Sequence, residues 1–198
     1  MKLFYTPNSP YARKIRILLR EKGLACQEVQ PTLNDAALSA LNPLGKVPTL
    51  VADDQTAMFD SVVISEFLEL IHPEPCMIPI DKWERVVVRK WEAIADGICD
   101  VLVTAVLEER RPQERQDATV IERADHKLVA TLKFLDAELA GHGHAHGNQF
   151  TLADAALVAA VGYVTLRRPQ LLQGLPSLLD YAKGHATRPS VLATIPPG

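Results

Sequence analysis

Residues 1–23, MKLFYTPNSPYARKIRILLREKG, limit the folds that the chain can adopt. A short apolar run over residues 2–5 predicts a strand, which the turn-forming residues 6–10 end. Pro10 suits the first position of a helix, and Ser9 before it suits the N-cap. Apolar residues then recur at helical spacing until Gly23. The chain therefore begins with a strand, a turn and a helix.

The alternation of strands and helices continues to residue 72. We expect a strand at 26–29, a short helical turn at 38–41, strands at 47–51 and 57–59, and a helix at 60–72. A strand–helix–strand unit favours parallel pairing, whereas the tight turn at residues 53–55 favours an antiparallel hairpin. The order βαβ followed by ββα predicts a small mixed sheet with helices packed on it.

The composition changes after a segment that holds three prolines in eight residues, 72–79. We expect domains at residues 1–75 and 83–198, joined by a linker at 76–82. The second domain reads as helical throughout, with two amphipathic helices and then a helix that is apolar on all sides. Thr151 and Asp154 have the spacing of a capping box at the start of that apolar helix. The predicted fold class is α/β plus all-α.

Charge and hydropathy exclude several classes of partner. Lysine and arginine number 21 against 24 aspartates and glutamates, a net charge of −3. We expect no nucleic-acid partner, and we interpret the basic residues of the first helix, Arg13, Lys14, Arg16 and Arg20, as a solvated outer face. The apolar run at residues 152–161 is too short to cross a bilayer, and the N-terminus lacks the apolar core of a signal peptide.

The cysteines and histidines suggest neither a disulfide framework nor a metal centre. The cysteines Cys26, Cys76 and Cys99 are odd in number and widely spaced, which favours a reducing cytoplasm. Histidines alternate over residues 142–146, HGHAH, and such a tract can chelate a metal. Neither a carboxylate nor a cysteine stands beside them in the sequence. We expect a solvated loop and no metal.

The tetrad Ser9-Pro10-Tyr11-Ala12 stands where the first strand passes into the first helix. Glutaredoxins place Cys-Pro-Tyr-Cys at this junction, where the helix N-terminus lowers the pKa of the first thiol. Here Ser9 and Ala12 replace both cysteines, which excludes dithiol exchange. A hydroxyl at the positive end of a helix can stabilise the thiolate of another molecule. Alternatively, Ser9 is only a helix cap.

Two further segments suit a peptide ligand. The Val47-Pro48 bond precedes a strand and is a candidate cis peptide, which would turn the backbone N–H and C=O of Val47 outward. Asp60 and Ser61 open a helix, whose free N–H groups form a carboxylate site. The alternatives are that Pro48 only shapes a loop and that Asp60 and Ser61 only cap the helix.

Together these segments give the chain a clear resemblance to the cytosolic glutathione transferase family. The segments that carry it are Ser-Pro-Tyr-Ala-Arg-Lys at 9–14, Gly-Lys-Val-Pro-Thr-Leu at 45–50, Asp-Ser at 60–61 and Phe-Thr-Leu-Ala-Asp at 150–154. The match is best to bacterial serine-type, zeta-like members. The resemblance implies a thioredoxin-like N-terminal domain, an all-helical C-terminal domain and a homodimer. It also implies a glutathione site in the first domain, with an electrophile pocket between the domains.

The resemblance implies a role for each matching residue. Ser9 would donate its hydroxyl to the glutathione sulfur, and Val47 would hold the cysteinyl part through its backbone. Ser61, with Asp60, would bind the γ-glutamyl end, and Lys46 could reach the glycyl carboxylate. The implied glutathione-binding set is Ser9, Lys46, Val47, Pro48, Asp60 and Ser61.

We therefore expect an enzyme that activates the thiol of glutathione, its co-substrate, for attack on an electrophilic small molecule. Tyr5 is an alternative to Ser9, because other members use a phenol from this region. Two alternative functions remain. The chain could be a glutathione transferase-like binding or interaction protein without turnover, or it could be a glutathione-dependent isomerase or dehalogenase. Trp83, Trp91 and a row of valines on the first long helix give it more apolar surface than one domain pair covers, which favours a dimer.

Overall fold

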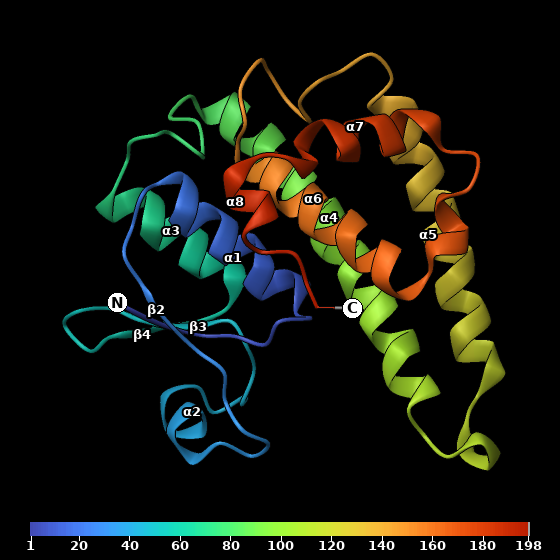
Figure 1. Cartoon of the computed structure of the whole chain (residues 1–198), viewed down its shortest axis with the longest axis horizontal. Coiled ribbons are helices and arrows are strands. Elements are labelled where there is room, and N and C mark those ends of the chain that lie inside the picture. The colour runs from blue at the N-terminus through green and yellow to red at the C-terminus, as the bar shows by residue number, and fades with distance from the viewer. Residues whose placement is uncertain (198) are drawn as a thin grey trace.

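The computed structural model describes residues 1–197 of the chain. A four-stranded mixed sheet with its helices forms the N-terminal part of the chain, and a bundle of helices forms the rest (Figure 1). The strands are β1 (Lys2–Phe4), β2 (Gln27–Val29), β3 (Thr49–Val51) and β4 (Ala57–Met58). The helices of the first domain are α1 (Pro10–Glu21), α2 (Ala36–Leu41) and α3 (Ser61–Ile71). The remaining helices are α4 (Lys82–Glu109), α5 (Ala118–Glu138), α6 (Leu152–Arg167), α7 (Pro176–Ala186) and α8 (Pro189–Leu192), with 3₁₀ turns at Gln113–Arg115 and Pro169–Leu172.

The sheet has the mixed pairing that the sequence predicts. Its strand order is β2-β1-β3-β4. β1 pairs with β2 in parallel, as expected for strands joined by a helix, and β3 pairs with both β1 and β4 in antiparallel. The thioredoxin-like first domain and the helical second domain are thus both confirmed.

Successive residues of β1 face opposite sides of the sheet and define two cores. Leu3 joins the main core with α1 and α3, whereas Phe4 joins a small cluster with Leu38 of α2 and Val51. The sheet is therefore covered on one face by α1 and α3 and on the other by α2, which lies apart from them in Figure 1.

The helical domain is built around α6, as its apolar sequence predicts. α6 is buried along most of its length and packs against α4 and α1. The predicted capping box is present: the Thr151 N–H donates to Asp154 Oδ2 at 2.8 Å. Among the described residues, no helix is long and apolar enough to cross a membrane.

The interpretation of the first helix as having a solvated outer face is wrong for three of its four basic residues. Arg13, Lys14 and Arg16 are buried, and only Arg20 is exposed. The reason is that α1 lies between the sheet and the second domain, where it contacts α6 and α4 (Figure 1). A helix covered on two sides by protein has little outer face left.

The remaining differences from the sequence expectations are small. Cys26, which is predicted to begin the second strand, is half-buried and immediately precedes β2. A short further helix, α8, which is not predicted from the sequence, begins at Pro189 after α7 ends.

Candidate functional site

Strand register brings three segments of the predicted site to one end of the sheet. Phe4 at the end of β1 pairs with Thr49 at the start of β3, and Met58 at the end of β4 pairs with Leu50. The chain leaves β1 and β4 at this end to begin α1 and α3, and it enters β3 there from residues 46–48. Two helix N-termini and the segment before β3 therefore meet at the same end of the sheet.

Ser9 is the N-cap of α1, and its hydroxyl keeps a free hydrogen. Its Oγ accepts a hydrogen bond from the Ala12 N–H at 3.2 Å. This bond uses a lone pair of the oxygen, so the hydroxyl proton can still be donated outward. The side chain is half-buried, and the Tyr11 N–H beside it has no partner among residues 1–197. Capping and donation to a ligand are therefore compatible at Ser9.

The segment before β3 presents open backbone. The Val47–Pro48 bond is cis, as the sequence predicts. Within the described chain, the N–H and C=O of Val47 make no hydrogen bond, whereas the neighbouring Lys46 C=O accepts from Thr49 Oγ1 at 2.9 Å. Asn42 Nδ2 also donates to the Lys46 C=O, which stabilises the turn. The Lys46 side chain is exposed.

The start of α3 offers a second set of polar groups. The Asp60 carboxylate caps the helix by accepting from the Val62 N–H at 3.0 Å, and Asp60 is exposed. The Ser61 side chain is buried, and no described residue hydrogen-bonds its hydroxyl or its N–H. This helix end therefore combines a carboxylate with unused donors, which suits a ligand end that carries both charges.

Two tyrosines near Ser9 contact other parts of the chain, and only Tyr11 donates its hydroxyl proton there. The Tyr5 hydroxyl accepts from Gln30 Nε2 at 3.1 Å, and the Arg16 guanidinium lies 4.4 Å from its ring centroid. The Tyr11 hydroxyl donates to Asp100 of α4, and burial together with this bond raises the pKa of Tyr11. Tyr11 is thus occupied, whereas Ser9 and Tyr5 each accept one hydrogen bond and keep a proton to donate. Of these two residues, only Ser9 lies at a helix N-terminus.

The chain's own thiols are poor nucleophiles. Burial raises the pKa of Cys26 to about 11 and raises the pKa of Cys99 well above its ordinary value. The pKa of Cys76 is also raised, by burial and by the neighbouring Glu69. These directions favour a ligand over the chain's own cysteines as the source of a thiolate.

An ion cluster that the sequence analysis missed joins the two domains beside the site. Lys14 Nζ of α1 lies 2.8 Å from Glu92 Oε1 and 2.7 Å from Asp96 Oδ2, both on α4. Arg89 extends the cluster by bonding Glu92 and Glu66 of α3. In the sequence, Glu92 and Asp96 are one helical turn apart and so lie on the same face of a helix. This spacing could have indicated a shared basic partner.

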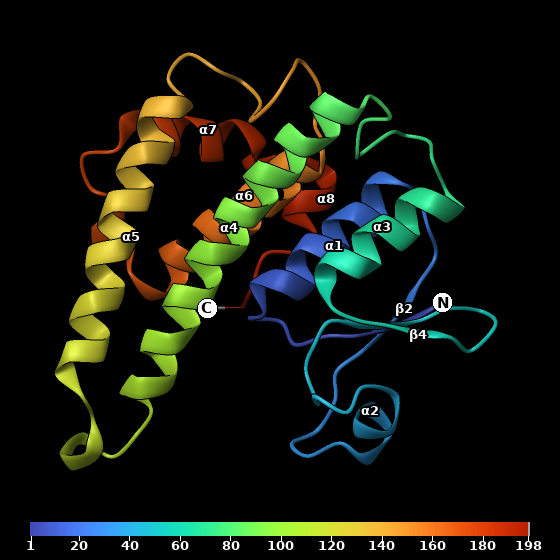
Figure 2. The same cartoon turned by 180° about the vertical axis from the view of Figure 1, so that it is seen from behind.

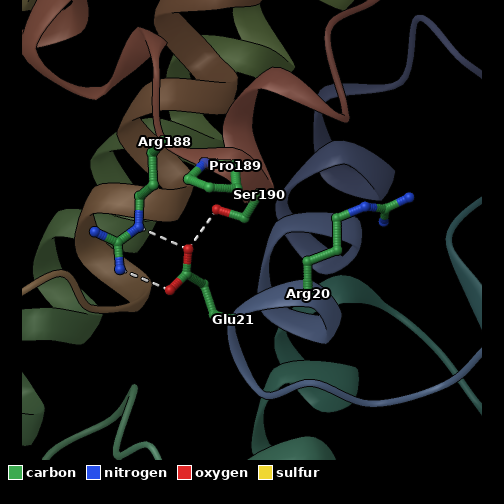
Figure 3. A pocket seen from close by; sticks show the side chains of 5 residues that line it. All are labelled: Arg20, Glu21, Arg188, Pro189 and Ser190. Atoms are coloured by element: carbon green, nitrogen blue, oxygen red, sulfur yellow. Dashed lines mark hydrogen bonds and ion pairs between the residues drawn. The ribbon is translucent and has the colours of Figure 1, made fainter.

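The far end of α1 is closed by a second ionic contact (Figure 3). A surface pocket there is lined by Arg20, Glu21, Arg188, Pro189 and Ser190. The Glu21 carboxylate accepts from Arg188 at 2.6 and 2.7 Å and from Ser190 Oγ. These groups satisfy one another, so the pocket is a junction between α1 and α8 rather than a second reaction site.

Comparisons with known proteins agree with this architecture. Family models of the glutathione S-transferase N-terminal and C-terminal domains match residues 3–76 and 94–189. The "Uncharacterized GST-like protein YibF" of Escherichia coli (strain K12) is 37% identical over 201 residues, covering 100% of this chain and 99% of its own.

Solved structures are similar over the same extent. A glutathione S-transferase from Methylobacillus flagellatus KT with GSH bound has a TM-score of 0.93 at 37% identity and covers 99% of each chain. One from Methylobacterium radiotolerans JCM 2831, in complex with glutathione sulfonate, has a TM-score of 0.93 at 31% identity, covering 100% of this chain and 95% of the other.

A thioredoxin-like domain with polar groups at one end of its sheet, followed by this helical bundle, defines the cytosolic glutathione transferase class. The chain belongs to the glutathione S-transferase family. Its family and fold are thereby confirmed, whereas the roles of Ser9, Lys46, Val47, Pro48, Asp60 and Ser61 remain predictions.

Proposed function

We propose that the protein is a glutathione transferase in which the Ser9 hydroxyl stabilises the thiolate of bound glutathione for attack on an electrophilic small molecule. The observation that carries this is the free hydroxyl proton of Ser9 at the N-terminus of α1, at the end of the sheet that Val47 and Ser61 also reach. Structure neighbours that bind glutathione, with the same fold over the whole chain, support the choice of ligand.

The required stabilisation is within reach of these groups. A free thiol has a pKa of about 8.5, so lowering it by about two units needs about 2.7 kcal/mol of extra stabilisation of the anion. A hydrogen bond to a charged acceptor contributes about 1.5–3 kcal/mol, and a helix N-terminus adds about 0.3–1 kcal/mol. Ser9 and the start of α1 together supply that amount.

The rest of glutathione fits the remaining groups. The open N–H and C=O of Val47 can pair with the cysteinyl residue in the manner of a strand, with Pro48 fixing the turn. The γ-glutamyl end carries an ammonium and a carboxylate, which match the Asp60 carboxylate and the free donors of Ser61. The exposed Lys46 ammonium would meet the glycyl carboxylate.

Two serine variants separate chemistry from capping. Glycine is nearly as good an N-cap as serine, so Ser9→Gly should keep stability within a few tenths of a kcal/mol while removing the hydroxyl. Loss of the hydrogen bond to the thiolate should raise the pKa of bound glutathione by about one to two units, since one unit corresponds to about 1.4 kcal/mol. The absorbance of the thiolate measures this pKa. Ser9→Thr keeps a hydroxyl and should retain most turnover of an aryl halide. An unchanged titration in Ser9→Gly would assign Ser9 to capping alone.

Binding is tested apart from turnover. Calorimetry should show saturable glutathione binding that Ser61→Ala weakens, whereas Ser39→Ala, on exposed α2, should not. Binding without turnover of any electrophile would favour the interaction-protein alternative. Isomerisation or dehalogenation in place of conjugation would favour a glutathione-dependent isomerase or dehalogenase. Such an enzyme would activate the thiol of glutathione in the same way.

We further propose that two copies assemble through the face formed by α3 and α4. Val63 and Val86 are exposed there, and Trp83 is 71% exposed, whereas Trp91 lies in the chain's own core. Figure 2 shows α3 and α4 on one face, and Arg85 on α4 pairs with Glu66 on α3. Such an apolar face suits a two-fold partner.

Light scattering should give twice 21.8 kDa for the wild type. Val86→Asp should yield a monomer, whereas Leu33→Asp, which alters an exposed residue before α2, should leave the dimer intact. A monomeric wild type would contradict this assembly.

The three free cysteines agree with a reducing cytoplasm, where we place the protein.

A further inference from the structure

Three side chains of types that can ligate metals meet in the second domain, away from the predicted glutathione-binding residues. His144 lies in the loop between α5 and α6, Asp154 in the first turn of α6, and His185 near the end of α7. Their ligand atoms all lie within 4.8 Å of one another. Figure 1 shows the loop at the end of the bundle where α7 also passes. The fold thus supplies the carboxylate that the sequence does not place beside the histidine tract.

The spacing of these atoms is close to that of a metal site. His144 Nδ1 lies 3.6 Å from Asp154 Oδ1, and His185 Nε2 lies 3.8 Å from the same oxygen. Tetrahedral zinc with ligand bonds of about 2.0–2.1 Å separates its ligand atoms by about 3.3 Å. The two imidazole centroids are 5.3 Å apart, against about 5 Å for two rings on one tetrahedral ion. Both distances to Asp154 are thus within a few tenths of an ångström of this separation, and the His144 and His185 ligand atoms lie within 4.8 Å of each other.

Two observations indicate that the cluster suits a cation. His144 Nδ1 is buried and has no hydrogen-bond partner in the described chain. The Asp154 carboxylate is fully buried and accepts only from neutral donors, and no lysine or arginine among residues 1–197 lies within ion-pair distance of it. Buried charges are ordinarily paired or coordinate a metal.

We propose that His144, Asp154 and His185 bind one divalent cation of borderline softness, for which Zn²⁺ fits the two-imidazole, one-carboxylate donor set. His144 is 26% exposed on its side chain, which gives an ion an entry path to the cluster, and a water would be the fourth ligand. The ion joins the loop to α6 and α7 and stabilises this end of the bundle.

One group competes with the ion. Asp154 Oδ1 already accepts from the Ala145 N–H at 2.8 Å and from the Tyr181 hydroxyl at 2.7 Å. An oxygen with two lone pairs cannot keep both bonds and ligate a metal. The Tyr181 hydroxyl can rotate away, whereas the backbone N–H cannot. Removing this hydroxyl should therefore tighten metal binding.

The histidine tract contains its own controls. His142 is exposed, and His146 pairs with Glu84 of α4. Neither belongs to the cluster around Asp154. Substituting His142 therefore removes an imidazole from the same loop without touching the proposed ligands.

The test uses the full chain, freed of metal with a chelator and titrated with Zn²⁺ by calorimetry. We expect one ion per chain and a rise in the thermal unfolding temperature. His144→Gln should weaken binding by more than about tenfold, because even loss of an outer partner costs a metal site roughly 10- to 100-fold. His142→Gln should bind like the wild type, and Tyr181→Phe should bind at least as tightly.

His144→Gln decides the matter, because its loop position allows the variant to fold even if a His185 variant does not. Absorption of Co²⁺ bound in place of Zn²⁺ should show tetrahedral bands in the wild type and His142→Gln, and lose them in His144→Gln. The proposal would be overturned if the wild type bound no zinc. It would also be overturned if the wild type and His144→Gln bound zinc with equal affinity. Looser binding in Tyr181→Phe would also count against it.

Discussion

Replacing Lys14 with methionine tests whether the buried ion cluster holds the two domains together. Lys14 is 1% exposed on its side chain, Glu92 2% and Asp96 20%. Methionine keeps the length and packing of the chain but removes the ammonium. Glu92 would retain Arg89, whereas Asp96 would have no cation within ion-pair distance in the described part of the chain.

The expected cost follows from that geometry. Removing one partner of a buried ion pair costs about 3–5 kcal/mol, because the other charge is left unpaired in the protein. Since Glu92 keeps Arg89 and Asp96 is partly solvated, we expect about 3 kcal/mol. Arg20→Met, on the same helix, removes a half-exposed pair with Glu28 and should cost only about 0–1 kcal/mol.

The assay is urea unfolding at fixed protein concentration, followed by circular dichroism and by tryptophan fluorescence. Burial raises the pKa of Asp96 even with Lys14 beside it. Loss of Lys14 should raise that pKa further, so protonation at lower pH relieves the penalty. The cost of Lys14→Met should be smaller at pH 5 than at pH 8. A cost no larger than that of Arg20→Met would refute the reasoning.

Two further changes give measurable shifts in stability. Gly162→Ala would place a Cβ 2.1 Å from Nη1 of Arg13, so the guanidinium must move; because Arg13 is only 5% exposed, we expect this to cost about 1 kcal/mol. Gly184→Ala, at an exposed position of α7, should stabilise slightly. Chemical unfolding measures both, and a stabilising Gly162→Ala would contradict the close contact. Burial alone would raise the pKa of Glu21, but hydrogen bonds from its partners, chiefly Arg188, outweigh it and lower the pKa below 4.5. The stability that Arg188→Gln removes should therefore be present above pH 4.5 and vanish as the pH falls below it; a pH-independent difference between unfolding curves would refute the pairing.

Several features in both domains could be predicted because their signals are local. Ser9 as N-cap, the cis bond before Pro48 and the capping box of Thr151 and Asp154 depend on residues within a few positions of one another. Local backbone chemistry decides these features, so the sequence predicts them without knowledge of the tertiary contacts.

The buried basic residues of α1 could not be found in the same way. An amphipathic pattern predicts one buried face, and the polar face is then assigned to solvent. Here the polar face meets a second domain whose acids, Glu92 and Asp96, lie 78 and 82 residues away along the chain. Only the docking of α4 and α6 on α1 makes Lys14 an interior residue.

The cluster around Asp154 could not be predicted from the sequence for a related reason. His144 and His185 are 41 residues apart, and the capping box already accounts for Asp154. A histidine tract without neighbouring ligands predicts a solvated loop. The fold changes this interpretation by folding the loop back onto the start of α6, where the Ala145 N–H donates to Asp154.

The helix α1 links the two halves of the proposed chemistry. Its N-terminus carries Ser9, while Lys14 one turn further on is fixed to α4 by two acids. The Tyr11 hydroxyl makes a third bond from α1 to α4, through Asp100. The residue that would meet the sulfur and the helix that would line the electrophile pocket are therefore held in one rigid geometry. Since reaction rate depends on how closely bound partners are aligned, loosening Lys14 should lower turnover even where glutathione affinity is kept.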